Sequence, residues 1–186
     1  MINSEKDLED YICENQEEFI KSLKDLYRIN QDIKFVGRQV YIGEHNIADL
    51  IYYYELKDEI KDKEGNITDE IIIKNFIIVE LKFRNISAVD LGQISRYMTT
   101  FQDKIYDDEV FCTQDVRVYG VLVGFDLDDN MQEIQMFLET FSESENYIRF
   151  ISINSNIVYK IPSYQHKEKY IQNLKLDERL IDAICE

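Results

Sequence analysis

The stretch from Ile71 to Phe83, Ile-Ile-Ile-Lys-Asn-Phe-Ile-Ile-Val-Glu-Leu-Lys-Phe, decides how the chain folds. Its nearly continuous apolar run predicts a β-strand that is buried on both faces. Apolar residues at helical spacing follow from Val89 to about Ile105, and a second apolar strand is predicted from Val116 to Phe125. A helix between two apolar strands is typical of a crossover connection, which joins parallel strands. We therefore expect an α/β (α+β) fold with a mixed sheet.

The residues before this stretch predict a helical segment followed by more strand. Ser4 to about Leu26 has interrupted helical spacing, which indicates one helix or two short ones. Two β-rich segments follow, from Phe35 to Ile42 and from Asn46 to Glu55. Lys57 to Asp69 is charged and contains a turn signal at Gly65, which predicts an exposed hairpin loop or insertion. The predicted order up to residue 125 is helix, three strands, helix, strand.

The chain after Asp126 is predicted to add helices and a hairpin to this core. The predicted elements are a helix from Asp128 or Asp129 to Leu138, a hairpin of Tyr147 to Ile153 and Ile157 to Ile161, and a final helical region from Ser163 toward Ile184. Because about 150 residues is a typical domain size, a chain of 186 residues indicates one domain. We expect a single domain over residues 1–186, with a core at about 4–125 and a C-terminal extension at about 126–186.

Composition excludes several classes of protein. The chain is 45% hydrophobic and carries 21 Lys and Arg against 37 Asp and Glu, a net charge of −16. This apolar content is too high for a disordered acidic chain, no apolar run approaches the roughly 20 residues of a membrane span, and no secretory signal is visible. Cys13, Cys112 and Cys185 are widely spaced and fit neither a disulfide framework nor a zinc pair. We expect a cytoplasmic protein with reduced thiols and no membrane contact.

The net charge argues against nucleic-acid binding, because contacts to phosphate need Lys and Arg. Net charge is a sum, however, and at ~0.15 M salt charges more than ~8 Å apart are largely screened. A local basic strip can therefore still bind nucleic acid, with an affinity that falls as salt rises. The candidates for this strip are Arg84, Arg96 and Lys104.

Three polar features occur in order on the predicted elements. Asp49 lies within an apolar strand, Glu80 and Lys82 end the next strand, and Gln93 and Tyr97 are one turn apart on the following helix. If the strand of Asp49 pairs beside that of Glu80, the two carboxylates converge; with waters and a backbone carbonyl they suit Mg²⁺ or Mn²⁺. Lys82, on the same face as Glu80, can hold a water or hydroxide. Gln93 and Tyr97 can hydrogen-bond a phosphate or orient the lysine.

This constellation resembles the PD-(D/E)XK nuclease superfamily. The segments similar to its RecB-like, NucS-like and YhcG-type branches are Asp49-Leu50-Ile51-Tyr52-Tyr53, Ile78-Val79-Glu80-Leu81-Lys82 and Gly92-Gln93-Ile94-Ser95-Arg96-Tyr97. The resemblance covers about two-thirds of the chain and implies a restriction-endonuclease-like core of helix, three strands, helix and strand. The chain departs from the motif at its first letter, because Ala48 stands where the superfamily has Pro.

The resemblance also implies a role for each site residue. Asp49, Glu80 and the backbone carbonyl of Leu81 would ligate Mg²⁺ or Mn²⁺. Lys82 would position the nucleophilic water. The residues that complete the implied site are Gln93 and Tyr97, which support the lysine or the phosphate, and Glu9 in the first helix, with Glu5 and Glu14 as alternatives.

The expected function is that of a metal-dependent nuclease that hydrolyses phosphodiester bonds, in DNA rather than RNA, within restriction, repair or defence. Two other hypotheses stay open. The same fold with this much negative charge can bind a basic protein surface without catalysis, for instance as a DNA mimic. It can also be a nuclease subunit whose specificity comes from a protein partner. A homodimer is compatible with each of these hypotheses.

Overall fold

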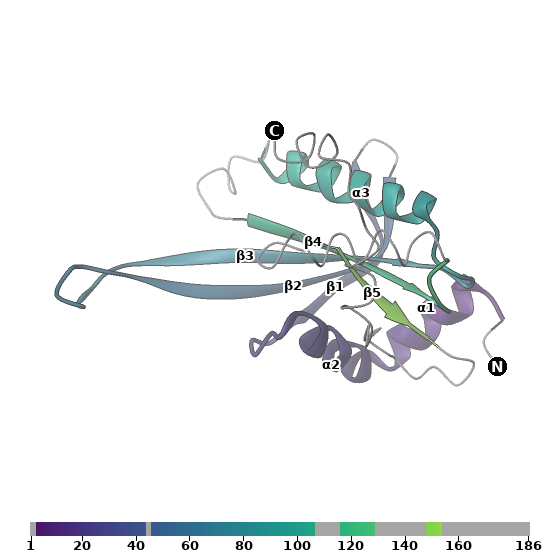
Figure 1. Ribbon diagram of the computed structural model, residues 1–186, viewed down its shortest axis with the longest axis horizontal. Coiled ribbons are helices and arrows are strands. Elements are labelled where there is room, and N and C mark those ends of the chain that lie inside the picture. Colours follow the sequence, from purple (N-terminus) through teal and green to yellow (C-terminus); the bar gives the residue numbers. More distant parts are fainter. Residues whose placement is uncertain (1–2, 44–45, 107–115, 129–147, 154–186) are drawn as a thin grey trace, which may run out of the picture.

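A five-stranded mixed sheet with helices on both faces organises the computed structural model of the chain (Figure 1). The structure describes residues 3–43, 46–106, 116–128 and 148–153. The helix predicted toward Leu138, the strand predicted from Ile157 to Ile161 and the final helical region after Ser163 lie outside these residues. Cys112 and Cys185 lie outside them as well. The expected α/β class with a mixed sheet is confirmed.

The described helices and strands follow the predicted order. They are α1 (Glu5–Glu14), α2 (Gln16–Tyr27), β1 (Lys34–Gly43), β2 (Asn46–Lys61), β3 (Ile67–Leu81), α3 (Ala88–Tyr106), β4 (Val116–Gly124) and β5 (Ile148–Ser152). The strands lie in the order β1-β2-β3-β4-β5, antiparallel from β1 to β3 and parallel from β3 to β5. Because α3 connects the parallel strands β3 and β4, the predicted crossover is confirmed. In the described part of the chain, no helix is both long and apolar enough to cross a bilayer.

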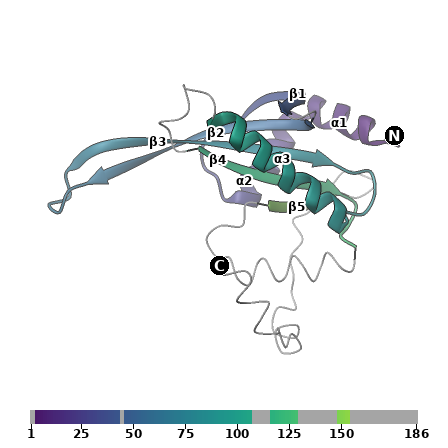
Figure 2. The ribbon, with the colours of Figure 1, turned by 90° about the horizontal axis from the view of Figure 1, so that it is seen from above.

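Each face of the sheet has its own hydrophobic core. Side chains along β3 alternate between the faces: Ile77 and Val79 pack with α1 and α2, whereas Ile78 packs with α3. Figure 2 shows α3 lying across β3 and β4, and Figure 1 shows α1 and α2 on the opposite side of the sheet. From Ile77 to Leu81 the strand is therefore buried on both faces, as its apolar run predicts, whereas Ile72 in the same run is 42% exposed. The same alternation turns Glu80 toward the α3 face.

The N-terminal helical segment consists of two helices. Ser4 Oγ accepts a hydrogen bond of 3.1 Å from the Asp7 backbone N–H and so caps the start of α1. Asn15 ends α1, and its backbone N–H bonds the carbonyl oxygens of Tyr11 and Ile12. Of the two alternatives that the sequence left open, two short helices is therefore the correct one.

The segment from Lys57 to Asp69 is an exposed hairpin, as predicted, but most of it is strand, so the prediction of a loop or insertion is wrong. β2 and β3 stay paired as far as Lys61, which stands opposite Ile67 after a register shift. Residues 56–73 thus form a two-stranded arm that projects well beyond the other strands (Figures 1 and 2). The sequence misled because charged residues between the apolar ones of an exposed strand have the composition of a loop.

The turn at the tip of the arm lies where the sequence predicts it. Asp62 Oδ1 accepts hydrogen bonds of 2.9 Å from the backbone N–H groups of Glu64 and Asn66. Gly65 has a φ of 87°, a conformation that glycine adopts without steric cost. These contacts close the ribbon and hold the register of its two strands.

The packing of α3 on β4 depends on a glycine. A Cβ atom on Gly120 would lie 2.7 Å from Met98 Sδ and 2.8 Å from Ile94 Cγ1, both on α3. Ile94 is fully buried, so its side chain has little room to move. The absence of a side chain at Gly120 therefore allows α3 to approach the sheet, and α3 carries two of the predicted site residues.

We expect Gly120→Ala to destabilise the protein by about 1–3 kcal/mol, because the added methyl group overpacks the contact with α3. Gly92→Ala is the matched control: it adds the same methyl group within α3, where a Cβ atom meets nothing within 4 Å. That control is expected to leave stability unchanged or to raise it by about 0.5–1 kcal/mol, since alanine favours a helix over glycine. Urea unfolding of the two variants tests the packing, and equal stabilities would contradict it.

Candidate active site

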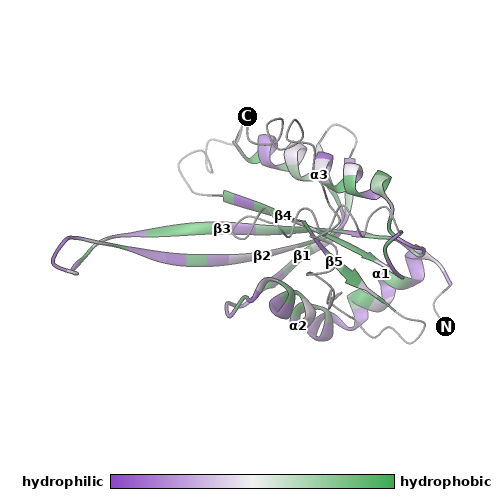
Figure 3. Cartoon of the chain, viewed as in Figure 1, coloured by the Kyte–Doolittle hydropathy of each residue, from purple (hydrophilic) through white to green (hydrophobic). Residues whose placement is uncertain are grey.

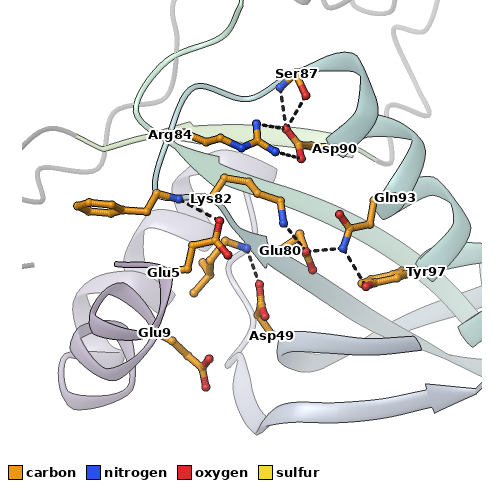
Figure 4. A network of polar contacts seen from close by, with 12 residues as sticks. Glu5, Glu9, Asp49, Glu80, Lys82, Arg84, Ser87, Asp90, Gln93 and Tyr97 are labelled. Atoms are coloured by element: carbon orange, nitrogen blue, oxygen red, sulfur yellow. Dashed lines mark hydrogen bonds and ion pairs between the residues drawn. The ribbon is translucent and has the colours of Figure 1, made fainter. Parts of the chain in front are cut away.

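Asp49 and Glu80 lie side by side at the ends of β2 and β3 that are remote from the arm. The register of the strands pairs Leu50 with Val79, so the next residues outward, Asp49 and Glu80, stand across the strand boundary from each other. The Leu81 backbone N–H donates a hydrogen bond of 2.7 Å to Asp49 Oδ2 (Figure 4). The strand pairing on which the predicted convergence of carboxylates depends is therefore confirmed.

The Glu80 carboxylate is buried, and its two oxygens differ. Oε1 accepts hydrogen bonds from Lys82 Nζ at 2.7 Å and from Gln93 Nε2 at 2.6 Å. Oε2 is buried and has no hydrogen-bond partner among the described residues. A buried oxygen without a partner costs free energy, because it has lost its hydration. Oε2 is thus an acceptor that a cation could satisfy.

Burial shifts the pKa values of Glu80, Asp49 and Lys82. Burial, and then the neighbouring charge of Asp49, raise the pKa of Glu80 to about 7, although Lys82 opposes the shift. Burial also raises the pKa of Asp49, against the hydrogen bond from Leu81. For Lys82, burial lowers the pKa but the hydrogen bond to Glu80 outweighs it, so the pKa is raised and the amine stays protonated at neutral pH.

Gln93 and Tyr97 reach the site from α3, in the order that the sequence predicts. Gln93 Nε2 donates to Glu80 Oε1 and also to Tyr97 Oη, at 2.8 Å. The sequence predicts that these residues support the lysine or a phosphate. In the structure Gln93 contacts the Glu80 carboxylate instead, and Tyr97 contacts Gln93, because the α3 face of the sheet presents Glu80 to the first turns of the helix.

Glu9, on α1, is linked to Asp49 through the side chain of Gln39. It is 8% exposed, and its Oε2 accepts a hydrogen bond of 2.7 Å from Gln39 Nε2. The same amide donates to Asp49 Oδ1 at 3.2 Å, so Gln39 bridges the two carboxylates. Glu5 stands one turn earlier, where its Oε1 accepts from the Phe83 backbone N–H at 3.4 Å.

Glu14 does not belong to the site. It is exposed at the end of α1. Nine residues at about 100° each place it about 180° around the helix from Glu5. The face of α1 that carries Glu5 and Glu9 turns toward the site, so Glu14 turns away from it. The alternative assignment of the helix glutamate to Glu14 is therefore wrong.

Gln39 is a site residue that the sequence analysis missed. Its φ is 49°, in the left-handed region that residues other than glycine seldom adopt and that costs of order 1–2 kcal/mol. In the neighbouring strand, Ala48 packs in the core below α3 while Leu50 packs in the core beside α1 and α2, so the usual alternation breaks at Asp49. An isolated Gln in a β-rich segment carries no signal for this, because the bridge exists only between three separate elements.

Of the three residues predicted to form a basic strip, Arg84 is ion-paired and the other two are exposed. Arg84 makes a two-pronged ion pair with Asp90, at 2.8 and 2.7 Å, and Asp90 also accepts from Ser87. Burial raises the pKa of Asp90 but these bonds outweigh it, so its pKa is lowered and its charge offsets that of Arg84. Arg84 therefore holds the start of α3, and its assignment to the strip is corrected. Arg96 and Lys104 are exposed on α3.

Asp49 lines an acidic pocket of about 430 Å³, and Glu80 lies buried behind it. Its lining residues are Glu5, Lys6, Glu9, Asp10, Arg38, Gln39, Asp49 and Leu81. Within residues 3–43, 46–106, 116–128 and 148–153, no three Asp, Glu, His or Cys side chains are arranged to hold a metal ion together. Mg²⁺ commonly binds through one or two carboxylates and keeps several waters, so Asp49 and Glu80 fit this ion without a third side chain.

No protein-family model matches the chain, and no curated protein sequence matches it. Two solved structures are similar in fold. One is the crystal structure of a repair endonuclease from Pyrococcus abyssi, with a TM-score of 0.46 and 20% identity over 83% of this chain and 48% of that one. The other is the structure of an EndoMS–dsDNA complex, with a TM-score of 0.40 and 18% identity over 82% of this chain and 45% of that one. The chain spans about half the length of these two proteins.

The raised pKa of Glu80 predicts a pH dependence of stability in EDTA. The folded protein holds a proton on Glu80 up to pH about 7, whereas a glutamate in the unfolded chain loses it near its usual value of 4.5. The free energy of unfolding therefore falls as pH rises between these two values, by an amount on the order of 1–3 kcal/mol. Glu80→Gln removes this titration, so the stability of wild type relative to the variant is expected to fall from pH 5 to pH 8.

Thermal unfolding of both proteins across this pH range measures the difference. Glu17→Gln, the same substitution on the exposed surface of α2, is the control and should follow wild type. A stability difference between wild type and Glu80→Gln that stays constant across the range would contradict the raised pKa.

Proposed function

We propose that the chain is a metal-dependent nuclease of the PD-(D/E)XK superfamily that hydrolyses phosphodiester bonds in DNA. The observation that supports this most is the Glu80 carboxylate. One oxygen is held by Lys82 and Gln93, and the other is buried without a hydrogen-bond partner among the described residues, beside Asp49. A purely structural ion pair gains nothing from a partnerless buried oxygen, whereas a ligand for a cation requires one.

In this proposal Asp49, Glu80 and the backbone carbonyl of Leu81 hold Mg²⁺ or Mn²⁺. The cation supplies Lewis acidity toward a phosphoryl oxygen and makes a hydrolytic water more acidic. Binding of the cation requires an ionised Glu80, so metal affinity rises as pH rises through about 7. Asp49 accepts the hydrogen bond from Leu81 N–H and also lines the acidic pocket.

Lys82 is proposed to position the attacking water and to offset negative charge that develops on the phosphate. Its raised pKa keeps it protonated, so it acts as a hydrogen-bond donor and not as a base. Gln93 and Tyr97 are positioning residues, because Gln93 contacts Glu80 directly and Tyr97 accepts a hydrogen bond from Gln93. Glu9, bridged to Asp49 by Gln39, contributes negative charge from the other side of the pocket.

A second candidate function is non-catalytic binding to a basic protein surface. The net charge of −16 favours it, because such a surface repels nucleic acid at long range and attracts cationic partners. The two candidates differ in one respect that can be measured: only the nuclease depends on Lys82 for turnover.

We expect cleavage of DNA in Mg²⁺ or Mn²⁺ and none in EDTA. Glu80→Gln and Lys82→Met should each lower the rate by about 10²–10⁴-fold, because each removes a group that acts on the reacting atoms. The assay uses supercoiled plasmid, linear duplex DNA, single-stranded DNA and single-stranded RNA. Lys63→Met, at the tip of the arm, is the control for Lys82→Met and should retain the wild-type rate.

Full activity of Glu80→Gln in a preparation free of contaminating nuclease would overturn the assignment of the site. Cleavage of RNA but not of DNA would overturn the substrate class alone. A wild-type protein that is inert on all four substrates and binds a basic protein would favour the non-catalytic candidate.

Stability in the presence of metal separates a cation site from a structural ion pair. In EDTA, Asp49→Asn should melt at or above the wild-type temperature, since it removes repulsion between buried carboxylates. In Mn²⁺, wild type should gain stability, by about 2.7 kcal/mol at 100 times the dissociation constant, and Asp49→Asn should gain much less. The control is Asp103→Asn on the exposed side of α3, which should respond to Mn²⁺ as wild type does.

Melting curves of wild type, Asp49→Asn and Asp103→Asn, each with EDTA and with Mn²⁺, distinguish a cation site from a structural ion pair. A strongly destabilised Asp49→Asn whose melting temperature does not respond to the metal would indicate a structural ion pair and contradict the cation site.

A further inference from the structure

The outer edge of the arm is open along β2. β1 pairs with β2 only as far as Lys34 opposite Tyr53, so from Tyr54 outward β2 pairs with β3 alone among the described residues. At Lys34, where the pairing between β1 and β2 stops, a pocket of about 420 Å³ lies beside the edge of β2. Its lining residues are Gln31, Asp32, Lys34, Tyr53, Tyr54, Glu55 and Lys57. An open edge presents unpaired backbone N–H and C=O groups, which can accept another strand.

The arm also exposes apolar side chains. Ile60 is 43% exposed and Ile67 is 53% exposed. Ile60 lies four residues beyond Leu56 in β2, so it continues the face that packs beside α1 and α2. Figure 3 shows apolar stretches along the arm outside the body of the molecule. An isolated two-stranded ribbon is marginally stable in water, because it buries little apolar surface. The arm would therefore gain stability from a partner that adds strands to it.

The outer part of β2 matches a reversed copy of itself. The segment reads Glu55-Leu56-Lys57-Asp58-Glu59-Ile60-Lys61. In an antiparallel pair centred on Asp58, Lys57 stands opposite Glu59 of a second copy, and Leu56 stands opposite Ile60. Each pairing occurs twice because of the symmetry, and Glu55 stands opposite Lys61 in the same register. Opposite charges and apolar pairs across antiparallel strands stabilise a sheet.

We propose that the chain forms a homodimer by antiparallel pairing of its β2 arm edge with the same edge of a second copy, centred on Asp58. The product is a four-stranded ribbon in the order β3-β2-β2-β3, with Leu56 and Ile60 of both copies on one face. A two-fold interface of this kind is self-complementary and closes on itself. The inference does not rest on the proposed nuclease function, because the arm lies at the opposite end of β2 from Asp49.

The charge pattern selects this register over its neighbours. Another register of the same two-fold dimer must have a different residue on the two-fold axis. Moving the axis by one residue along β2 changes the partner of every residue by two positions. Centring on Lys57 places Glu55 opposite Glu59, and centring on Glu59 places Lys57 opposite Lys61. Both alternatives set like charges against each other, which is unfavourable. The unfavourable contact in the proposed register is between the two copies of Asp58.

The composition of the arm favours a second copy over nucleic acid. Between Glu55 and Lys74 the chain has seven Asp and Glu against four Lys. A surface with excess negative charge repels phosphate, so the arm is a poor partner for DNA. A second copy presents the same mixed charges in reversed order, so Lys57 of each copy can stand opposite Glu59 of the other.

Analytical ultracentrifugation of the full chain over a range of concentrations tests this proposal. Wild type is expected to dimerise. Lys57→Glu should weaken the dimer about tenfold or more, because two attractive pairs become repulsive. The double variant Lys57→Glu/Glu59→Lys restores opposite charges across the axis and should recover the dimer. Asp58→Asn removes the like-charge contact on the axis and should strengthen it.

Lys63→Glu is the matched control, because it makes the same change in charge at the tip of the arm, outside the paired segment. It should dimerise as wild type does. A wild type that stays monomeric at its highest soluble concentration would overturn the proposal, and so would Lys57→Glu and Lys63→Glu with equal dimer affinity. A monomer that binds duplex DNA more weakly after Lys57→Glu would assign the arm to nucleic acid and overturn it as well. Circular dichroism confirms that each variant is folded.

Discussion

The hydrogen bonds that Glu80 accepts from Lys82 and Gln93 hold the candidate site together. The bond from Gln93 joins the central strand of the sheet to the helix that covers it. A carboxylate is seldom buried unless it is paired. Here the pairing satisfies one oxygen and leaves the other without a hydrogen bond among the described residues. The position of α3, and therefore of Tyr97, is coupled to this carboxylate, and Gly120 lets the helix come close enough for the contact.

The site combines several features that each cost stability. Two carboxylates with raised pKa values lie next to each other, and Gln39 takes a left-handed backbone conformation to bridge Glu9 and Asp49. Structures retain such features where they serve a function, and they offset the cost elsewhere. The two extensive cores on either side of β3 supply that compensation. The ion pair of Arg84 with Asp90 holds the start of α3 next to the site without adding a free positive charge.

The arm and the site lie at opposite ends of the same two strands. β2 and β3 carry Asp49 and Glu80 at one end, and the tip of the arm at Gly65 lies at the other (Figure 1). The strands are continuous between the two ends, so pairing at the arm would set the orientation of one site relative to another without any contact at the site itself. In a dimer of this form, the two candidate sites would face outward at the ends of a shared ribbon.

The sequence by itself determined the order of the elements and most of the site. The apolar run around Ile77 predicts a strand buried on both faces, and the spacing of Gln93 and Tyr97 predicts that they share a helix face; both follow from short-range periodicity, which the chain carries locally. Only the tertiary structure decided that Gln93 contacts Glu80 and that Gln39 bridges Glu9 and Asp49, since those contacts join elements far apart in the chain. It also decided that residues 56–73 form an arm, because the pairing of the two strands depends on backbone hydrogen bonds between them, which the charged composition of residues 57–69 does not reveal.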